Sequence, residues 1–246
     1  MSFHPLNVTV HATPAALGEV TGRRAAEVIT AAIEARGRAR VMLAAAPSQT
    51  PTLTTLAAQD VDFDKVTFFH MDDYLGLAPD APQGFGNWLE TNFFAHVDGH
   101  PTFHRMDPQL PATDALRAYT EALGEEPFDL TLCGLGVNAH LAFNDPPANF
   151  SDPDPVRLVQ LDETSRQQQV DEGHFPTFDA VPTEALTVTI PRLLNADVVI
   201  CSVLGTAKRD AVPGAPPHGV GHLPHPDVPD PAGAGGPRPR DSAGVR

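Results

Sequence analysis

Short apolar runs recur along the first four-fifths of the chain, separated by longer segments of mixed character. Each run is five to seven residues long, which is typical of buried strands. The runs that predict strands are 40–46, 66–70, 128–133, 156–161, 185–190 and 198–204. Because several of these runs are apolar throughout, they favour a mostly parallel sheet that is covered on both faces.

The segments between the runs carry helix signals. The region 14–36 is rich in alanine, begins after Thr13, a good N-cap, and ends at Gly37. Thr50 is expected to cap a second helix that starts at Pro51. Further helices are predicted at 87–94, at 113–123, capped by Thr113, and as a short turn at 191–196. Strands that alternate with helices in this way predict a single α/β domain.

The composition changes after Val212. Residues 213–246 are rich in proline and glycine and show no apolar periodicity, so we expect them to be disordered and to lie outside the folded domain of residues 1–212. Three histidines in this segment are interspersed with prolines, and we do not interpret them as a metal site.

Composition and charge narrow the range of partners and compartments that the protein can have. The 246 residues carry a formal net charge of −15 with only 16 lysines and arginines, which argues against nucleic acid or an anionic membrane surface as a partner. No leader and no membrane span are expected. Cys133 and Cys201 lie in apolar runs and are interpreted as buried thiols in a reducing compartment. We therefore expect a cytoplasmic protein.

The segment 133–147 carries the strongest functional signal. The apolar run 128–133 leads into a turn that contains Gly134 and Gly136, and His140 and Asp145 follow five residues apart. Glycine allows a sharp bend and close approach to a ligand, and a histidine beyond a strand end can move protons near neutral pH. A purely structural histidine is the alternative. The two glycines do not match a dinucleotide-binding fingerprint, which needs a third glycine opening a helix.

A second polar cluster follows the run 66–70. Asp72 and Asp73 come directly after His70 and Met71. The functional hypothesis is that one carboxylate is a base at the carboxyl edge of the sheet, with a pKa raised by partial burial. The alternative is a pair of loop-capping aspartates. His70 is interpreted as a packed histidine.

Two further junctions suggest an anion site. Ser48, Gln49 and Thr50 lie where the run 40–46 meets a helix start, so free backbone amides and hydroxyls can face a negative group. A plain helix cap is the alternative. Lys208, at another strand-to-helix junction, adds a positive charge that suits a phosphate.

Taken together, these segments resemble the glucosamine-6-phosphate deaminase (isomerase) family, which shares its fold with 6-phosphogluconolactonase. The similarity runs in order from about Val8 to Val212. It rests on the segments 45–51, 69–77, 134–146, 181–188 and 203–208. The resemblance implies a Rossmann-like fold and a reaction, without cofactor or metal, in which glucosamine 6-phosphate and water become fructose 6-phosphate and ammonia.

The resemblance also implies roles for individual residues. Asp72 matches the acid/base that moves a proton between C2 and C1 through an enediol-type intermediate. His140 matches the residue that helps to open the sugar ring. Asp145 stands where the deaminases carry a glutamate, and Asn138 where they carry an aspartate that pairs with the histidine.

The remaining site residues follow the same comparison. Ser48, Gln49, Thr50 and Lys208 fall on the phosphate-binding segments, with Ser48-Gln49 in place of a glycine pair, while Asp73, Gly134 and Gly136 fall on the substrate-binding loops. These departures indicate a divergent branch of the family.

Two other functions stay open at this stage. One is hydrolysis of a sugar-phosphate lactone on the same fold, which would release no ammonia. The other is a non-catalytic sugar-phosphate sensor, which Asn138 and the unusual C-terminal segment favour, and which Asp72 and His140 oppose. A homo-oligomer is compatible with the sequence.

Overall fold

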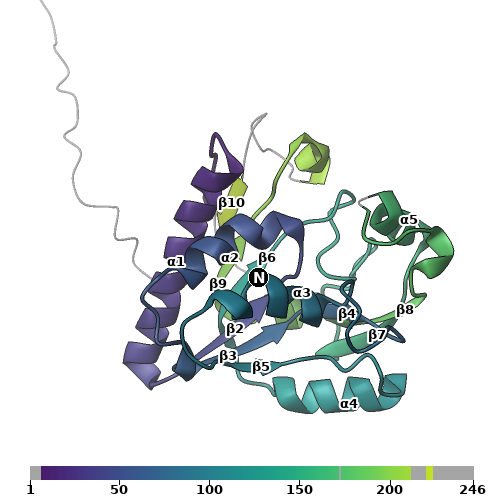
Figure 1. Ribbon diagram of the computed structural model, residues 1–246, viewed down its shortest axis with the longest axis horizontal. Helices are drawn as coiled ribbons and strands as arrows, with labels where there is room; N and C mark the ends of the chain where they lie inside the picture. The colour runs from purple at the N-terminus through teal and green to yellow at the C-terminus, as the bar shows by residue number, and fades with distance from the viewer. Residues whose placement is uncertain (1–6, 172, 212–219, 224–246) are drawn as a thin grey trace, which may run out of the picture.

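A computed structural model describes residues 7–171, 173–211 and 220–223, and its centre is a seven-stranded sheet (Figure 1). The strand order is β1-β10-β9-β6-β2-β3-β5. The strands of this sheet are β1 (Asn7–Thr9), β2 (Ala39–Leu43), β3 (Val66–His70), β5 (Thr102–His104), β6 (Phe128–Cys133), β9 (Ala196–Cys201) and β10 (Val220–Leu223).

Five neighbouring strands of this sheet, β9-β6-β2-β3-β5, are parallel, and β10 and β1 extend it by antiparallel pairing. The register places Leu43 beside His70 and Cys133 beside Cys201, so these strands end at the same edge. The expected mostly parallel sheet is confirmed. Because parallel strands share one carboxyl edge, the loops that follow β2, β3, β6 and β9 meet there.

A second, antiparallel sheet has the order β4-β8-β7, with β4 (Asp72–Tyr74), β7 (Val156–Gln160) and β8 (Glu184–Val188). Met71 joins the two sheets, because its N–H donates to Leu43 of the large sheet and its carbonyl accepts from Val188 of the small one. The sequence predicted β7 and β8 as strands but not their separation into another sheet. The separation of the two sheets at Met71 places Asp72 just beyond the end of β3.

The helices are α1 (Pro14–Arg36), α2 (Thr50–Ala57), α3 (Phe85–Asn92), α4 (Ala112–Leu123), α5 (Glu163–Asp171) and α6 (Ile190–Leu193). The predicted caps of α1 are confirmed: Thr13 Oγ1 accepts from the Ala16 N–H, and Gly37 has a left-handed φ of 77°.

Two predicted caps are wrong. Thr50 is the first residue of α2, because the 3₁₀ turn Pro47–Gln49 precedes it and continues into the helix. Thr113 lies inside α4, which follows Pro111 directly. Helix α5 was not predicted, since its sequence is polar almost throughout and has no apolar stripe.

Alternating side chains of the large sheet enter two apolar layers. Val41, Leu43 and Phe68 pack with α1, α2 and α3, whereas Met42 and Phe69 pack with α4, α6 and the small sheet. Figure 1 shows α1, α2 and α3 on one side of the sheet and α4 on the other. The predicted helices on both faces are therefore confirmed.

The C-terminal prediction is tested at one place only. Most of 213–246 lies outside the described residues, but Val220–Leu223 form β10 between β1 and β9. The expectation of disorder is wrong for these four residues, because the sheet edge pairs with their backbone despite the flanking prolines and glycines.

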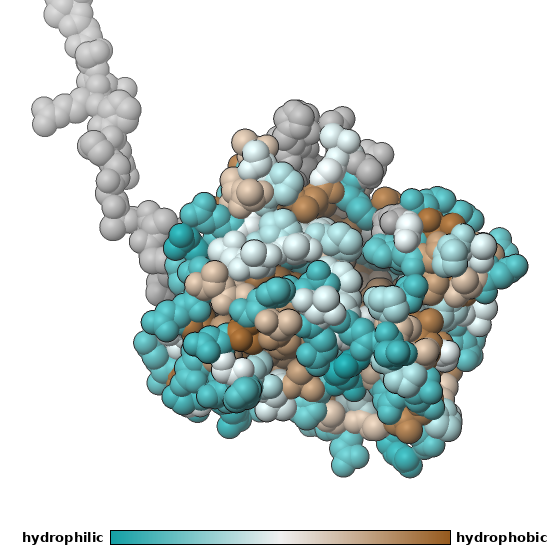
Figure 2. Space-filling model, viewed as in Figure 1, coloured by the Kyte–Doolittle hydropathy of each residue, from teal (hydrophilic) through white to brown (hydrophobic). Residues whose placement is uncertain are grey.

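Polar residues cover most of the described surface in the view of Figure 2, with apolar ones scattered among them. No helix in the described part of the chain has the length and apolar character that a membrane span requires.

Candidate active site

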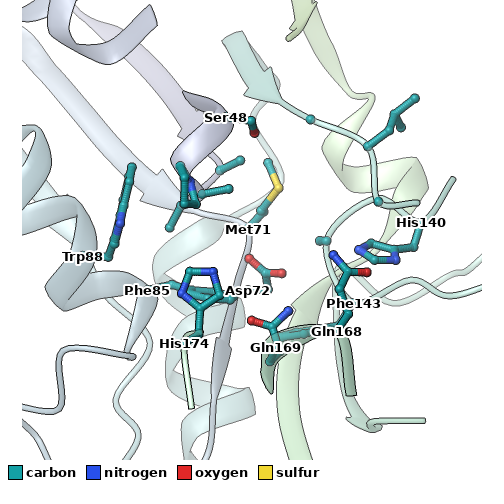
Figure 3. Close-up of a pocket in the computed structure, with 18 of the residues that line it drawn as sticks. Ser48, Met71, Asp72, Phe85, Trp88, His140, Phe143, Gln168, Gln169 and His174 are labelled. Carbon is teal, nitrogen blue, oxygen red and sulfur yellow. The ribbon is translucent and has the colours of Figure 1, made fainter. Parts of the chain in front are cut away.

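A cavity of about 440 Å³ opens at the carboxyl edge of the large sheet. Residues that follow β2, β3, β6 and β9 line it, as the parallel topology requires, and α3 and α5 contribute the remaining walls. Figure 3 shows Asp72 at the centre of this space, with His140 to one side, Trp88 to the other and Ser48 above. The two polar clusters that the sequence placed after separate strands therefore meet in one cavity.

Asp72 is 7% exposed and lies on β4, beside Thr187 of β8. Burial raises the pKa of its carboxyl well above the ordinary value, and the neighbouring Asp73 carboxyl raises it further. A carboxylate with such a high proton affinity, facing a cavity, can take a proton from a carbon next to a carbonyl and return it to another.

Asp73, which the sequence assigned to the substrate-binding loop, is directed into the fold. It is absent from the cavity lining, and its carboxylate accepts the backbone N–H groups of Tyr74, Phe85 and Gly86 at 2.9, 2.9 and 3.0 Å. Burial raises its pKa to about 6, against the opposing effect of these three hydrogen bonds. Asp73 fastens the first turn of α3 to β4 and thereby fixes its neighbour Asp72.

His70 is fully buried, and its Nε2 accepts the Met106 backbone N–H at 2.8 Å. Burial lowers its pKa to about 3, so the ring is neutral at physiological pH. The structure thus agrees with its interpretation as a packed histidine.

His140, Asn138 and Asp145 form a chain of hydrogen bonds at the cavity wall. Asn138 Oδ1 accepts the His140 backbone N–H at 3.1 Å, which fixes the orientation of the amide, and Nδ2 then donates to Asp145 Oδ1 at 3.1 Å. His140 Nδ1 lies 2.6 Å from the same Asn138 oxygen and 3.3 Å from Asp145 Oδ1. Because both oxygens are acceptors, Nδ1 carries a proton and Nε2 is left for proton exchange with a ligand.

Asp145 is stabilised as a carboxylate. Burial favours its neutral form, but hydrogen bonds from His140 and Asn138, the charge of His140 and a hydrogen bond from Ser165 outweigh that effect and lower its pKa to about 2. Ser165 Oγ lies 3.0 Å from each carboxylate oxygen. The neutral Asn138 amide therefore links the imidazole to the Asp145 carboxylate, which also lies 3.3 Å from His140 Nδ1.

Gly136 in the glycine-rich turn is needed for the close approach of another side chain and not for a left-handed φ. A Cβ on Gly136 would lie 2.1 Å from His140 Cε1 and 2.3 Å from both ring nitrogens. Left-handed φ angles occur instead at two alanines of the loop, 67° at Ala139 and 53° at Ala142. Gly136 provides the space in which the imidazole rests.

The predicted phosphate segments divide into lining and buried residues. Ser48 and Lys208 line the cavity, whereas Gln49 and Thr50 do not. Gln49 is 1% exposed, and its Nε2 donates to the carbonyl of Cys133 at 3.1 Å, so it joins the 3₁₀ turn to β6. Among the described lining residues, Lys208 is the only lysine or arginine.

Several lining residues were missed from the sequence. Aromatic side chains form one wall, and polar side chains on or just after α5 form another. These residues are Phe85, Trp88, Phe143, Gln168, Gln169 and His174. The aromatic residues resemble ordinary core positions in the sequence, and the polar ones lie in a region without periodicity, so no local signal marked them.

The described residues include no cluster of three or more His, Cys, Asp or Glu side chains that would hold a metal ion.

Comparison with known proteins decides the family. The model of the family described as glucosamine-6-phosphate isomerases/6-phosphogluconolactonase matches residues 12–229. The chain belongs to this family. The match extends beyond Val212, where the sequence resemblance was expected to end, and includes β10.

Similar proteins include two glucosamine-6-phosphate deaminases. The chain is 28% identical to one from Streptococcus gordonii over 78% of its own length and 80% of the relative. It is 31% identical to glucosamine-6-phosphate deaminase 1 of Bacillus subtilis over 63% of each chain.

Solved structures agree with this assignment. A monomeric glucosamine-6-phosphate deaminase has a TM-score of 0.71 and 26% identity, with 81% of this chain and 82% of that one covered. A 6-phosphogluconolactonase from Shewanella baltica, at 17% identity and a TM-score of 0.67 over 82% of each chain, shows the same fold.

Proposed function

We propose that the protein converts glucosamine 6-phosphate and water to fructose 6-phosphate and ammonia without a cofactor. One observation carries the proposal: a buried carboxylate of high proton affinity, Asp72, faces the same cavity as the His140–Asn138–Asp145 chain, and Ser48 and Lys208 line that cavity as well. The reaction needs a base at the sugar's C2, an acid at its ring oxygen and a site for its phosphate.

His140 is assigned to ring opening. The ring oxygen of the sugar accepts a proton from His140 Nε2 while the C1 hydroxyl loses one, which gives the open-chain aldehyde. Asn138 holds the Nδ1 proton in place, so the ring presents Nε2 to the substrate. Asp145 stabilises the imidazolium during this exchange, which an amide alone does not do by charge.

Asp72 is assigned to the isomerisation. Its carboxylate removes the proton from C2 and delivers it to C1, while a proton passes from the C2 amine to the C1 oxygen. The C=O double bond at C1 is thereby replaced by a C=N double bond at C2, and C1 becomes a CH2OH group. Water then adds to C2, the C–N bond breaks, and ammonia leaves together with the ketose. The step that consumes water is hydrolytic, whereas the proton transfer before it is an isomerisation.

The phosphate is assigned to Ser48 and Lys208, which both line the cavity. The turn after β2 supplies a hydroxyl, and Lys208 supplies the positive charge.

All residues assigned here belong to one chain, so the proposed reaction does not require a second copy even where the protein forms a homo-oligomer. The buried free thiols Cys133 and Cys201 support a cytoplasmic setting, and the net charge of −15 opposes nucleic acid as a partner.

The proposal is tested by offering the purified protein glucosamine 6-phosphate and 6-phosphogluconolactone in parallel. We expect ammonia and fructose 6-phosphate from the first, and hydrolysis of the second no faster than without protein. Lactone hydrolysis without ammonia release would assign the chain to the other branch of the family. Binding of both compounds without turnover of either would support a sensor.

A further inference from the structure

Ser165 is held rigidly at the start of α5, although no sequence signal marked it. It is 6% exposed, and its backbone N–H donates to Asp162 Oδ1 at 2.7 Å, the hydrogen bond of a helix N-cap. Its hydroxyl points out of the helix and lies 3.0 Å from both oxygens of Asp145. A helix twenty residues further along the chain thus touches the carboxylate behind His140.

The contacts of Asp145 divide between two sides. Asn138 and His140 approach Oδ1 from the loop after β6, at 3.1 and 3.3 Å, and His140 is the titratable group that faces the carboxylate. Ser165 is the contact from α5, and it spans both oxygens. Without the hydroxyl, the carboxylate would be free to rotate away from the Asn138 amide and the His140 imidazole.

Helix α5 also reaches the substrate space. Gln168 and Gln169 follow Ser165 by three and four residues, so all three lie on one face of the helix, and both glutamines line the cavity. In Figure 3 the two glutamine side chains lie close to Asp72 and His140. One face of α5 therefore lines the cavity and also contacts the Asp145 carboxylate.

We propose that Ser165 is a positioning residue: its hydroxyl holds Asp145 toward Asn138 and His140 and so ties α5 to the proton-transferring histidine. The kinetic part of this inference rests on the proposed deaminase reaction, but the structural part does not. Hydrogen bonds to an ionised group are stronger than neutral ones, and the one from Ser165 contributes to the low pKa of Asp145.

The test compares Ser165→Ala with Thr164→Ala, which removes an exposed hydroxyl from the neighbouring position of the same helix. Carboxyl ¹³C NMR titration of the ligand-free protein follows Asp145, with Asp145→Asn to assign its signal. We expect Ser165→Ala to raise the pKa of Asp145 by about one pH unit, and Thr164→Ala to leave it unchanged.

The kinetic readout separates positioning from binding. Ser165→Ala should lower kcat for ammonia release about 10-fold and change KM less than about 3-fold. Ser165→Thr, which restores the hydroxyl, should recover most of kcat. If Ser165→Ala does not fold, Ser165→Cys, of similar size but a weak donor, should give the same direction of change.

An Asp145 titration in Ser165→Ala that matches that of Thr164→Ala would overturn the inference. The same holds for a Ser165→Ala enzyme with unaltered kcat. If the wild type releases no ammonia, the proposed function fails, and the NMR titration still decides the role of Ser165.

Discussion

Replacing Gly136 by alanine tests directly whether the position of His140 matters. The added Cβ would lie 2.1 to 2.3 Å from three atoms of the imidazole, while ordinary van der Waals contact begins at 3.4 Å. The ring must therefore retreat by about 1 Å, and its Nδ1 hydrogen bond to Asn138 must lengthen or break. A misplacement of this size in a catalytic group costs on the order of 100-fold in rate.

The assay is kcat for ammonia release from glucosamine 6-phosphate, with circular dichroism as the check on folding. Gly134→Ala is the matched control, because its Cβ would meet its neighbours only at 3.0 Å or more, and we expect a loss below about 10-fold. In a His140→Ala background, Gly136→Ala should have little further effect, since the clashing ring is gone. A folded Gly136→Ala enzyme with kcat within about 3-fold of wild type would show that the position of His140 does not limit the rate.

Three further predictions concern stability and binding. The pKa of Asp145, lowered from 3.8 to about 2, stabilises the fold above pH 4 by about 2 kcal/mol, and this contribution is lost as pH falls toward 2. In denaturant unfolding, the difference in unfolding free energy between wild type and Asp145→Asn should therefore shrink by about 1 kcal/mol between pH 7 and pH 3; a difference independent of pH would contradict this. Asp73→Ala leaves three backbone N–H groups without their acceptor and should cost about 3 kcal/mol in urea unfolding, against less than about 1 kcal/mol for Asp107→Ala, which loses one exposed hydrogen bond; equal costs would show that Asp73 does not hold α3. Lys208→Ala should raise KM for glucosamine 6-phosphate about 10-fold or more with a smaller effect on kcat, whereas the surface variant Lys65→Ala should change neither, and an unchanged KM in Lys208→Ala would place the phosphate elsewhere.

The parts of the site that follow strands were predictable from the sequence. An apolar run that ends in polar residues marks the carboxyl edge of a parallel sheet, and this predicted that Asp72 and His140 lie at the same edge. The alternation of side chains along a strand also indicated that His70 is a packed histidine, unlike the aspartates that follow it. Local sequence sufficed here because strand direction and sheet edge together determine where such residues point.

Other features depended on contacts between distant segments. The two sheets separate at a single residue, Met71, and strand β4 has only three residues. Both features are too short to give a periodic pattern. Gln49 and Ser48 are adjacent in a 3₁₀ turn, where successive side chains point about 120° apart, so sequence alone did not show which one faces the cavity. Ser165 reaches Asp145 only through the packing of α5.

The most direct test of the proposed function is the joint measurement of ammonia and fructose 6-phosphate from glucosamine 6-phosphate, with wild type beside Asp72→Asn. The proposed deaminase reaction predicts one-to-one production of both compounds by the wild type and a loss of at least about 1,000-fold in the variant, whose amide does not accept the C2 proton. Equal rates in two folded proteins, or no ammonia from the folded wild type, would contradict it.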